Sequence, residues 1–279
     1  MPVLPLLAGL AAIALMYIAG AKLFANARFG GMTAAVFALT PLIWYQLQSQ
    51  PVSLYPLLFV AGWLAAVAYS DDLRAPAWAA LAGGVLGLGV YGSHAAAVMM
   101  PTYLLLTIAL VAPDRVWSRA TLAFAGAFAV AAAPFALAVF RQPDDVRRTI
   151  TAYHIYDAYR FNVLQGAHEL VSWVSLTARA DIYYGYFNPT VLFLTGRVLL
   201  FPLVVLLPAG LYRMLIHEST RFSRLSLAGF FAAPLAAALT AERPVPARII
   251  YITTFAAIVS TYGIRQLLSL RILHRTAGL

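Results

Sequence analysis

The chain has 279 residues, of which 62% are hydrophobic and only 10% are charged. A soluble domain of this size carries charge on roughly a quarter of its residues, so the composition excludes an ordinary soluble globular protein. The net charge of +9 could suit nucleic acid, but the basic residues stand in the breaks between long apolar runs. Arginines in such breaks set membrane topology and contact lipid head groups. We therefore expect the lipid bilayer, and no nucleic acid, among the partners.

Apolar runs of about 20 residues can cross a bilayer as helices. Nine runs approach this length, at residues 3–21, 32–47, 52–69, 76–91, 95–111, 120–140, 191–212, 225–239 and 249–267. They predict an all-α, polytopic membrane helix bundle of about nine spans, which forms a single membrane domain over residues 1–279. Residues 1–140 supply six spans and residues 191–279 supply three. Residues 141–190 form an external helical segment between spans six and seven.

The breaks between apolar runs fall into two alternating sets, and Lys and Arg are concentrated in one of them. One set of breaks contains Lys22, Arg28, Arg74, Arg115, Arg119, Arg213, Arg221, Arg224, Arg265, Arg271 and Arg275. The other set includes two short turns, 46–51 and 92–94, that have no Lys or Arg. The positive-inside rule places the first set in the cytoplasm. We expect a multi-pass protein of a cell inner membrane, with the amino terminus outside and the carboxyl terminus cytoplasmic.

The external segment offers room for a binding site. Residues 144–160 predict an amphipathic helix, and a second helical stretch over about 167–179 leads into a tyrosine-rich run. Tyrosines in such a place are typical of an interfacial belt that anchors a bundle. Alternatively, aromatic faces and arginines form a pocket for an amphiphilic ligand, because the planar guanidinium matches phosphate oxygens.

A short external turn, 242–248, is doubly basic and breaks the charge rule. Its arginines, Arg243 and Arg248, fit a phosphate-binding role, and two prolines would stiffen the turn that presents them. The alternative is that they reach lipid phosphates and bind nothing specific. His94 lies in another external turn, 92–94, and either faces substrate or is a satisfied histidine at the mouth of the bundle.

Two other patterns indicate structure rather than chemistry. The glycine-rich run 83–89 lies inside an apolar span with no preceding strand, so it predicts close helix packing and not a nucleotide loop. The absence of cysteine excludes disulfides and thiolate metal sites, and the scattered histidines show no metal spacing.

Four stretches carry a resemblance to a known family. They are YIAGAKLF at 17–24 with RFGG at 28–31 and LTP at 39–41, GLGVY at 87–91 with MP at 100–101, YFNPTVLFLTG at 186–196, and ARIIY at 247–251. In this order they resemble the multi-spanning glycosyltransferases of the GT-C type, in the bacterial family 39 group related to protein mannosyltransferases and aminoarabinose transferases.

The resemblance implies that a sugar passes from a polyprenyl-phosphate carrier to an acceptor on the external face. Basic residues of the family bind the carrier phosphate, which implies this role for Arg243 and Arg248, with Arg179 as a lesser candidate. It also implies that His94, Tyr183 and Tyr184 line the substrate cavity.

Family members carry the key acid, a general base or metal contact, in a first external loop after a first helix. The first span here is similar to the family's second, so we expect an amino-terminally truncated enzyme, an incorrect start or a non-catalytic relative. Asp157 and Asp181 are the fallback catalytic acids. A divalent metal is compatible with the family, but the sequence identifies no site for one.

Two other functions stay open. The first is a transporter or flippase for an amphiphilic substrate, although the spans carry no acidic residue near their middle, where transporters keep functional charges. The second is a non-catalytic carrier-binding subunit, for which Arg243 and Arg248 would be dispensable for transfer.

Overall fold

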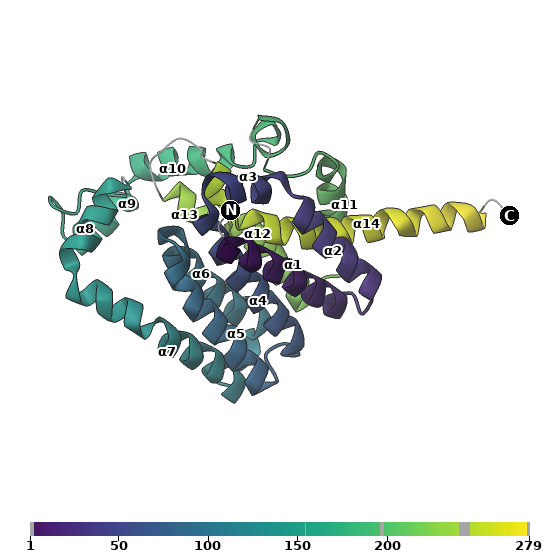
Figure 1. Ribbon diagram of the computed structural model, residues 1–279, viewed down its shortest axis with the longest axis horizontal. Coiled ribbons are helices and arrows are strands. Elements are labelled where there is room, and N and C mark those ends of the chain that lie inside the picture. Colours follow the sequence, from purple (N-terminus) through teal and green to yellow (C-terminus); the bar gives the residue numbers. More distant parts are fainter. Residues whose placement is uncertain (1–2, 154, 196–197, 240–245, 278–279) are drawn as a thin grey trace.

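The computed structural model describes residues 3–153, 155–195, 198–239 and 246–277, and every regular element in these ranges is a helix (Figure 1). The elements are α1 (Val3–Leu23), α2 (Ala27–Leu39), α3 (Pro41–Ser49), η1 (Pro51–Leu54), α4 (Tyr55–Tyr69), α5 (Pro76–Gly89), η2 (Val90–Gly92), α6 (His94–Val111), η3 (Pro113–Arg115), α7 (Arg119–Arg141), α8 (Pro143–Ala152), α9 (Val163–Leu170), α10 (Trp173–Gly185), η4 (Thr190–Thr195), α11 (Leu203–Ile216), α12 (Arg221–Ala232), α13 (Leu235–Ala238), η5 (Pro246–Ile249) and α14 (Ile252–Ala277). The all-α prediction is confirmed for these residues.

Fewer of the described helices reach the length of a membrane span than the nine apolar runs suggest. Three described helices, α1, α6 and α7, are long and apolar enough to cross a membrane, and α2 with α3 makes a fourth if the pair counts as one bent span. Others are short: α11 has 14 residues, so it rises about 21 Å, against a hydrocarbon layer of roughly 30 Å. These apolar helices are typical of a membrane protein, but nine spans are not confirmed.

Prolines account for two of the interruptions. Pro41 begins α3 and cannot continue the hydrogen bonding of α2, and the two helices bend by 46°. Pro234 separates α12 from the four-residue α13 within the expected run 225–239. The run 191–212 is also divided, because η4 is a π-helical turn and α11 begins only at Leu203.

Glycines allow the closest helix contacts. A Cβ at Gly83 of α5 would overlap the backbone carbonyl of Phe124 in α7, and one at Gly87 would lie 2.7 Å from the Phe128 carbonyl oxygen. The glycine-rich run 83–89 therefore packs α5 against α7, as the sequence predicted. Gly210 and Gly263 do the same for α11 and α14, each against the backbone of the other helix.

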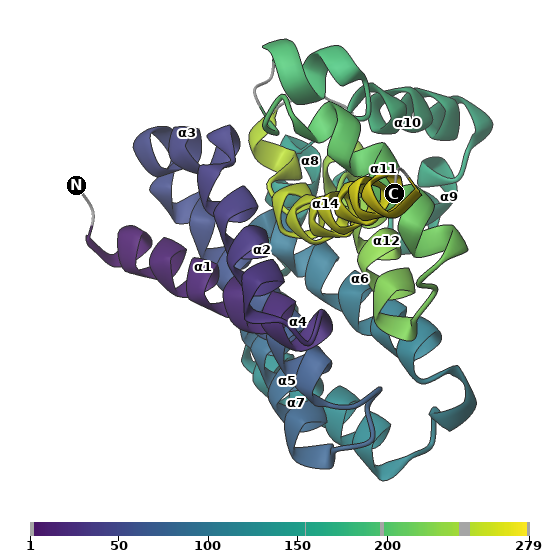
Figure 2. The same cartoon turned by 90° about the vertical axis from the view of Figure 1, so that its right-hand side faces the viewer.

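Buried polar and aromatic contacts join the two halves of the chain. The hydroxyls of Thr33 in α2 and Thr261 in α14 lie 2.9 Å apart and are buried. The rings of Trp63 in α4 and Tyr103 in α6 are stacked with centroids 5.1 Å apart, and both contact Phe255 of α14. The first part of α14 is thus central to the fold, whereas its carboxyl end projects from the bundle toward the viewer in Figure 2.

The segment between α7 and α11 is helical, but its helices differ from the prediction. The expected helix over 144–160 is wrong beyond Ala152, where α8 ends. The carboxylate of Asp157 accepts the backbone N–H groups of Tyr159 and Arg160 (3.0 and 3.2 Å), and this local turn competes with a helix. The expected stretch 167–179 is split into α9 and α10, because the Ser172 hydroxyl caps a new helix at Trp173.

The breaks between helices gather at two ends of the bundle. At one end, which we call the Lys22 end, one cavity is lined by Lys22, Asp71, Val111 and Arg221, from the ends of α1, α4 and α6 and the start of α12. At the other, the His94 end, Ser93 and His94 meet residues of the α8 and η5 regions. This separation matches the two sets of breaks that the charge pattern distinguishes.

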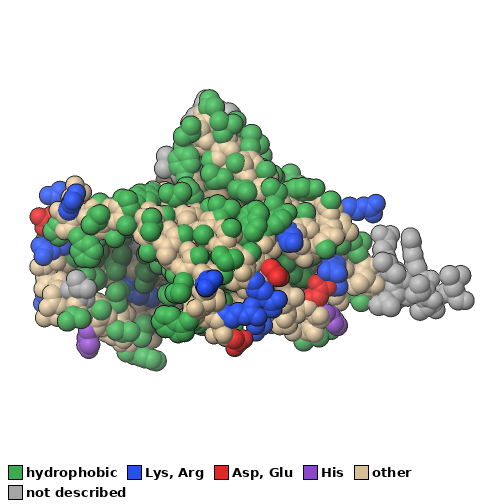
Figure 3. Space-filling model, turned by 90° about the horizontal axis from the view of Figure 1, so that it is seen from below, with side chains coloured by type: hydrophobic (Ala, Val, Ile, Leu, Met, Phe, Trp, Pro, Cys, Tyr) green, Lys and Arg blue, Asp and Glu red, His purple; other side chains and the backbone are tan. Residues whose placement is uncertain are grey.

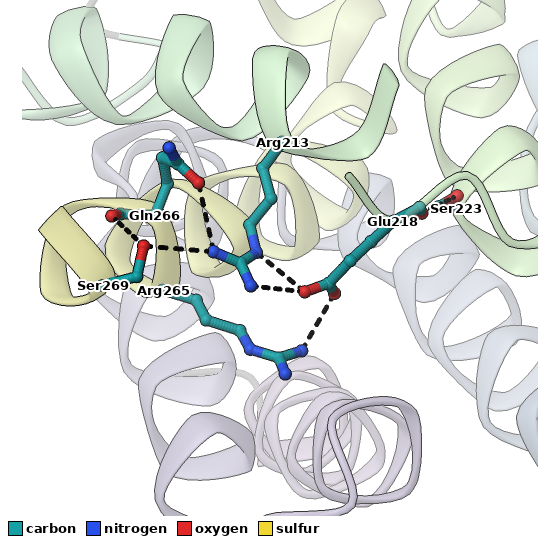
Figure 4. A network of polar contacts seen from close by, with 6 residues as sticks. All are labelled: Arg213, Glu218, Ser223, Arg265, Gln266 and Ser269. Atoms are coloured by element: carbon teal, nitrogen blue, oxygen red, sulfur yellow. Dashed lines mark hydrogen bonds and ion pairs between the residues drawn. The ribbon is translucent and has the colours of Figure 1, made fainter. Parts of the chain in front are cut away.

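A network of charged residues fastens α11 to α14 at the Lys22 end (Figure 4). The Glu218 carboxylate accepts hydrogen bonds from Nε of Arg213 (2.8 Å) and Nη1 of Arg265 (2.9 Å). Arg213 also donates to Gln266 and Ser269 of α14 (3.1 and 3.4 Å). Glu218 lies two residues after the end of α11, so two helices that pack through glycines are also held by ion pairs.

Candidate functional site

The candidate site begins at the amino end of α6. Ser93 has an extended backbone, with φ at −173°, and its hydroxyl accepts the N–H of Ala96 at 3.1 Å, which caps the helix. The same hydroxyl lies 3.4 Å from that of Tyr251, beside the start of α14. His94 is therefore the first residue of a capped helix, and its side chain is exposed.

Tyr153 is the centre of the site. Its ring centroid lies 5.4 Å from that of His94, and the guanidinium carbon of Arg248 lies 5.9 Å from the same ring. Tyr153 follows α8, whereas Arg248 belongs to η5. Three parts of the chain that are distant in sequence thus converge on one aromatic ring, which is partly exposed.

This arrangement favours an anionic ligand. A guanidinium against an aromatic face keeps its charge and its planar set of N–H donors, and the contact is worth about 0.5–2 kcal/mol depending on exposure. Arg248 is half-buried, so a phosphate there would meet a cation with reduced competition from water. The His94 imidazole lies beside the same ring and can donate a hydrogen bond to such a ligand.

Arg179 supports the loop that carries Tyr153. Its Nη2 donates to the carbonyl of Ile155 at 2.7 Å and its Nε donates to the Ser175 hydroxyl at 3.0 Å. Its Nη1 is buried, with no hydrogen-bond partner among the described residues. Burial lowers the pKa of Arg179, although an arginine remains charged at neutral pH. The structure thus gives Arg179 a role in positioning the loop.

Tyr183 and Tyr184 lie on α10, which packs against the end of α12. The Tyr183 hydroxyl donates to the carbonyl of Phe231 at 2.8 Å, and its ring contacts Phe187. Two effects raise the pKa of the Tyr183 hydroxyl: burial, which is the larger, and the neighbouring Tyr184. The Tyr184 side chain is 70% exposed. Among described residues, no ring contact or hydrogen bond joins this pair to His94 or Arg248.

The remaining candidates lie apart from the cluster. Asp157 uses one carboxylate oxygen for its own turn, and Asp181 is exposed on α10. Within the described ranges, neither carboxylate forms an ion pair or hydrogen bond with His94 or Tyr153. Arg243 lies outside the described residues. The described part of the chain contains no group of three or more His, Asp or Glu side chains that could hold a metal ion.

Two features of the site were not found from the sequence. Tyr153 belonged to the periodic face of the expected helix 144–160, but that periodicity did not single it out from the other tyrosines as a site residue. The second feature is Tyr103, which is fully buried and whose ring centroid lies 6.3 Å from that of Tyr251. Neither the Tyr103 hydroxyl nor the Trp63 indole N–H has a hydrogen-bond partner among the described residues. An unsatisfied buried donor costs about 1–3 kcal/mol, so a polar group that paired with either donor would stabilise the protein.

Comparisons with known proteins leave the chain unassigned: no protein-family model, no curated protein and no solved structure matches it.

Proposed function

We propose that the chain binds a polyprenyl-phosphate-linked sugar at the His94 end and acts in transfer of that sugar to an acceptor, as a GT-C type membrane glycosyltransferase. The proposal places the His94 end outside a bacterial inner membrane and the Lys22 end in the cytoplasm, with the amino terminus outside and the carboxyl terminus inside. The observation that carries the proposal is the convergence of Arg248 and His94 on the Tyr153 ring.

The surroundings of the cluster suit an amphiphilic carrier. Helix α7 leads toward α8 and Tyr153, and it exposes large apolar side chains, including Val130 at 76% and Phe140 at 82%. Exposed apolar surface of this kind lies against lipid chains in a membrane, and a prenyl chain has the same character. The carrier would therefore place its chain along apolar helices and its phosphate at Arg248.

The proposal assigns phosphate binding to this chain and leaves the general base unassigned. A base must come within hydrogen-bond reach of the acceptor hydroxyl. Asp157 and Asp181 make no contact with the cluster in the described ranges, so neither receives the role. No residue is assigned to a metal.

The test is binding of a fluorescent polyprenyl phosphate to the purified protein in detergent micelles. We expect Arg248→Ala to weaken binding about ten- to hundredfold, because a charged hydrogen bond is worth about 1.5–3 kcal/mol. Arg248→Lys should weaken it less, since it keeps the charge and loses the planar fork.

The matched control is Arg148→Ala, which removes an exposed arginine of α8 whose partner Asp145 lies 3.8 Å away. It should leave carrier binding unchanged. Equal binding by Arg248→Ala and Arg148→Ala would show that Arg248 makes only nonspecific lipid contacts and would refute the proposal.

Transport of an amphiphile is a second candidate, which the broken helices favour. Transporters build substrate sites from discontinuous helices, and here α2 and α3 bend at Pro41 while α12 and α13 are divided at Pro234. Counterflow of labelled polyprenyl phosphate across proteoliposomes, without transfer of the sugar, would favour this function over the first.

A further inference from the structure

A second site lies at the Lys22 end, away from the cluster around Tyr153. The cavity there has a volume of about 500 Å³ and is lined on its polar side by Lys22, Asp71, Asp72, Thr220, Arg221 and Arg224. This volume is typical of cavities for small molecules or head groups. Figure 3 shows that basic side chains gather beside acidic ones on a surface that is otherwise largely hydrophobic.

Positive charge in this cavity is only partly neutralised. Lys22 and Arg224 are exposed, and neither has a carboxylate within ion-pair distance among the described residues. The Lys22 ammonium lies 5.1 Å from the centre of the Tyr69 ring. Arg221 donates to the carbonyl of Val111 at 3.1 Å and pairs with the exposed Asp114 at 3.3 Å. Three cations from two separate elements thus surround one space.

Negative charge lines the same cavity. Asp71 and Asp72 have φ of 49° and 55°, and Leu73 continues in the left-handed region at 56°. Such a run is unfavourable for residues other than glycine and tends to occur at functional sites. It is held in place by Leu73, whose N–H donates to the Ser70 hydroxyl at 3.1 Å and whose side chain is buried. Asp71 forms an ion pair with Arg74 at 4.0 Å, and this pair is weak because both side chains are exposed.

The other wall of the cavity is apolar, and its surroundings resemble a membrane interface. The apolar residues that line it are Leu23, Val67, Ala68, Val111 and Phe222. Exposed aromatic side chains stand at the same end of the bundle, with Trp117 at 85%, Tyr212 at 51% and Trp78 at 40% exposure. Trp and Tyr are enriched where a membrane protein passes the head-group layer. The apolar lining and the exposed aromatic side chains therefore favour a membrane lipid as the ligand of this cavity.

We propose that this cavity binds a zwitterionic phospholipid that carries a phosphate and a primary ammonium. The phosphate lies between Lys22, Arg221 and Arg224, and the ammonium lies against Asp71 and Asp72. The acyl chains leave along the apolar wall. A purely anionic head group would bring its phosphate close to both carboxylates with no cation of its own to offset them, so the mixed charge of the cavity selects the zwitterion.

The experiment is native mass spectrometry of the delipidated full chain in detergent. It is titrated separately with phosphatidylethanolamine, with phosphatidylglycerol and with inorganic phosphate. We expect phosphatidylethanolamine adducts to persist at the lowest concentration. The double variant Lys22→Ala/Arg224→Ala should reduce their affinity by about tenfold or more, because it removes two charged contacts to phosphate.

The double variant Asp71→Asn/Asp72→Asn separates the two halves of the proposal. It should weaken phosphatidylethanolamine binding and leave phosphatidylglycerol binding unchanged or stronger, because only the first lipid has an ammonium. Asn also tolerates the left-handed backbone, which keeps the turn intact. Arg148→Ala, at the far end, is the matched control for general loss of charge.

Three results would overturn the inference: preference for phosphatidylglycerol in the wild type, displacement of the lipid by millimolar phosphate, or equal lipid affinity in all variants. Size-exclusion profiles and melting temperatures of the variants establish that each is folded. Because the cavity is distinct from the Tyr153 cluster, the outcome does not depend on whether the protein transfers a sugar.

Discussion

Removal of the Glu218 carboxylate should destabilise the protein strongly, although the residue lies outside the regular helices. Glu218 holds Arg213 of α11 and Arg265 of α14 together. Glu218→Ala leaves both guanidinium groups without their shared partner at a place with limited access to water. Because α11 and α14 also pack through close glycine contacts, a small separation of the two helices would affect both kinds of interaction.

The magnitude follows from the burial of the three side chains. Their exposed fractions are 13% for Arg213, 22% for Glu218 and 37% for Arg265. Breaking a fully buried ion pair costs about 3–5 kcal/mol, whereas an exposed pair is worth at most about 1 kcal/mol. Glu218 lies between these limits, so we expect a loss of about 2–3 kcal/mol. A protein of this size loses about 2–4 °C of melting temperature per kcal/mol, which predicts a decrease of about 4–12 °C.

The assay is thermal unfolding in one detergent at low and high salt, with Asp145→Ala as the control. The Arg148–Asp145 pair has exposed fractions of 74% and 64% and an N···O distance of 3.8 Å, so its loss should change the melting temperature very little. If Glu218→Ala and Asp145→Ala melt within a degree of each other, the network contributes no more than a surface pair and the reasoning from burial is refuted.

Two further predictions concern packing and pH. Gly83→Ala should lower the melting temperature, because the added Cβ meets the backbone of Phe124 and overpacking costs about 1–3 kcal/mol. The control is Gly84→Ala, where the added Cβ has open space, so its melting temperature should be unchanged or higher. Equal destabilisation of both variants would contradict the assigned contact. Tyr183→Phe removes the hydrogen bond to Phe231 and should cost about 1 kcal/mol at neutral pH. The raised pKa of Tyr183 means that the folded state holds the hydroxyl proton more tightly than the unfolded state, so wild-type stability should fall as pH rises above about 10. Tyr183→Phe should lack this pH-dependent loss of stability. Superimposable profiles of stability against pH for the two proteins would disprove the effect.

Several parts of the structure could be predicted from the sequence because they depend on local composition. Long apolar runs predicted helices, and glycines inside an apolar run predicted close helix packing, for which the structure supplies α7 as the partner of α5. The alternation of charged breaks predicted which breaks share an end of the bundle. Helix lengths were less accessible, because hydropathy summed over a window does not register that Pro41 and Pro234 divide an apolar run.

The candidate site at Tyr153 could not be derived in the same way. His94 and Arg248 were both predicted as site residues, but nothing in the sequence showed that they share one aromatic ring. Asp157 and Asp181 were chosen because they flank tyrosines, whereas in the structure the Asp157 carboxylate accepts the N–H groups of a local turn.

The sequence by itself determined that this is an apolar, all-helical protein with its charges at the breaks, because these properties follow from hydrophobic burial and backbone hydrogen bonding within each segment. Only the tertiary structure decided which breaks meet. Packing of α14 against α2, α4, α6 and α11 brings Tyr251 beside Ser93 and places Glu218 between Arg213 and Arg265. Such pairings depend on how helices pack across the whole bundle, and no local pattern of residues encodes them.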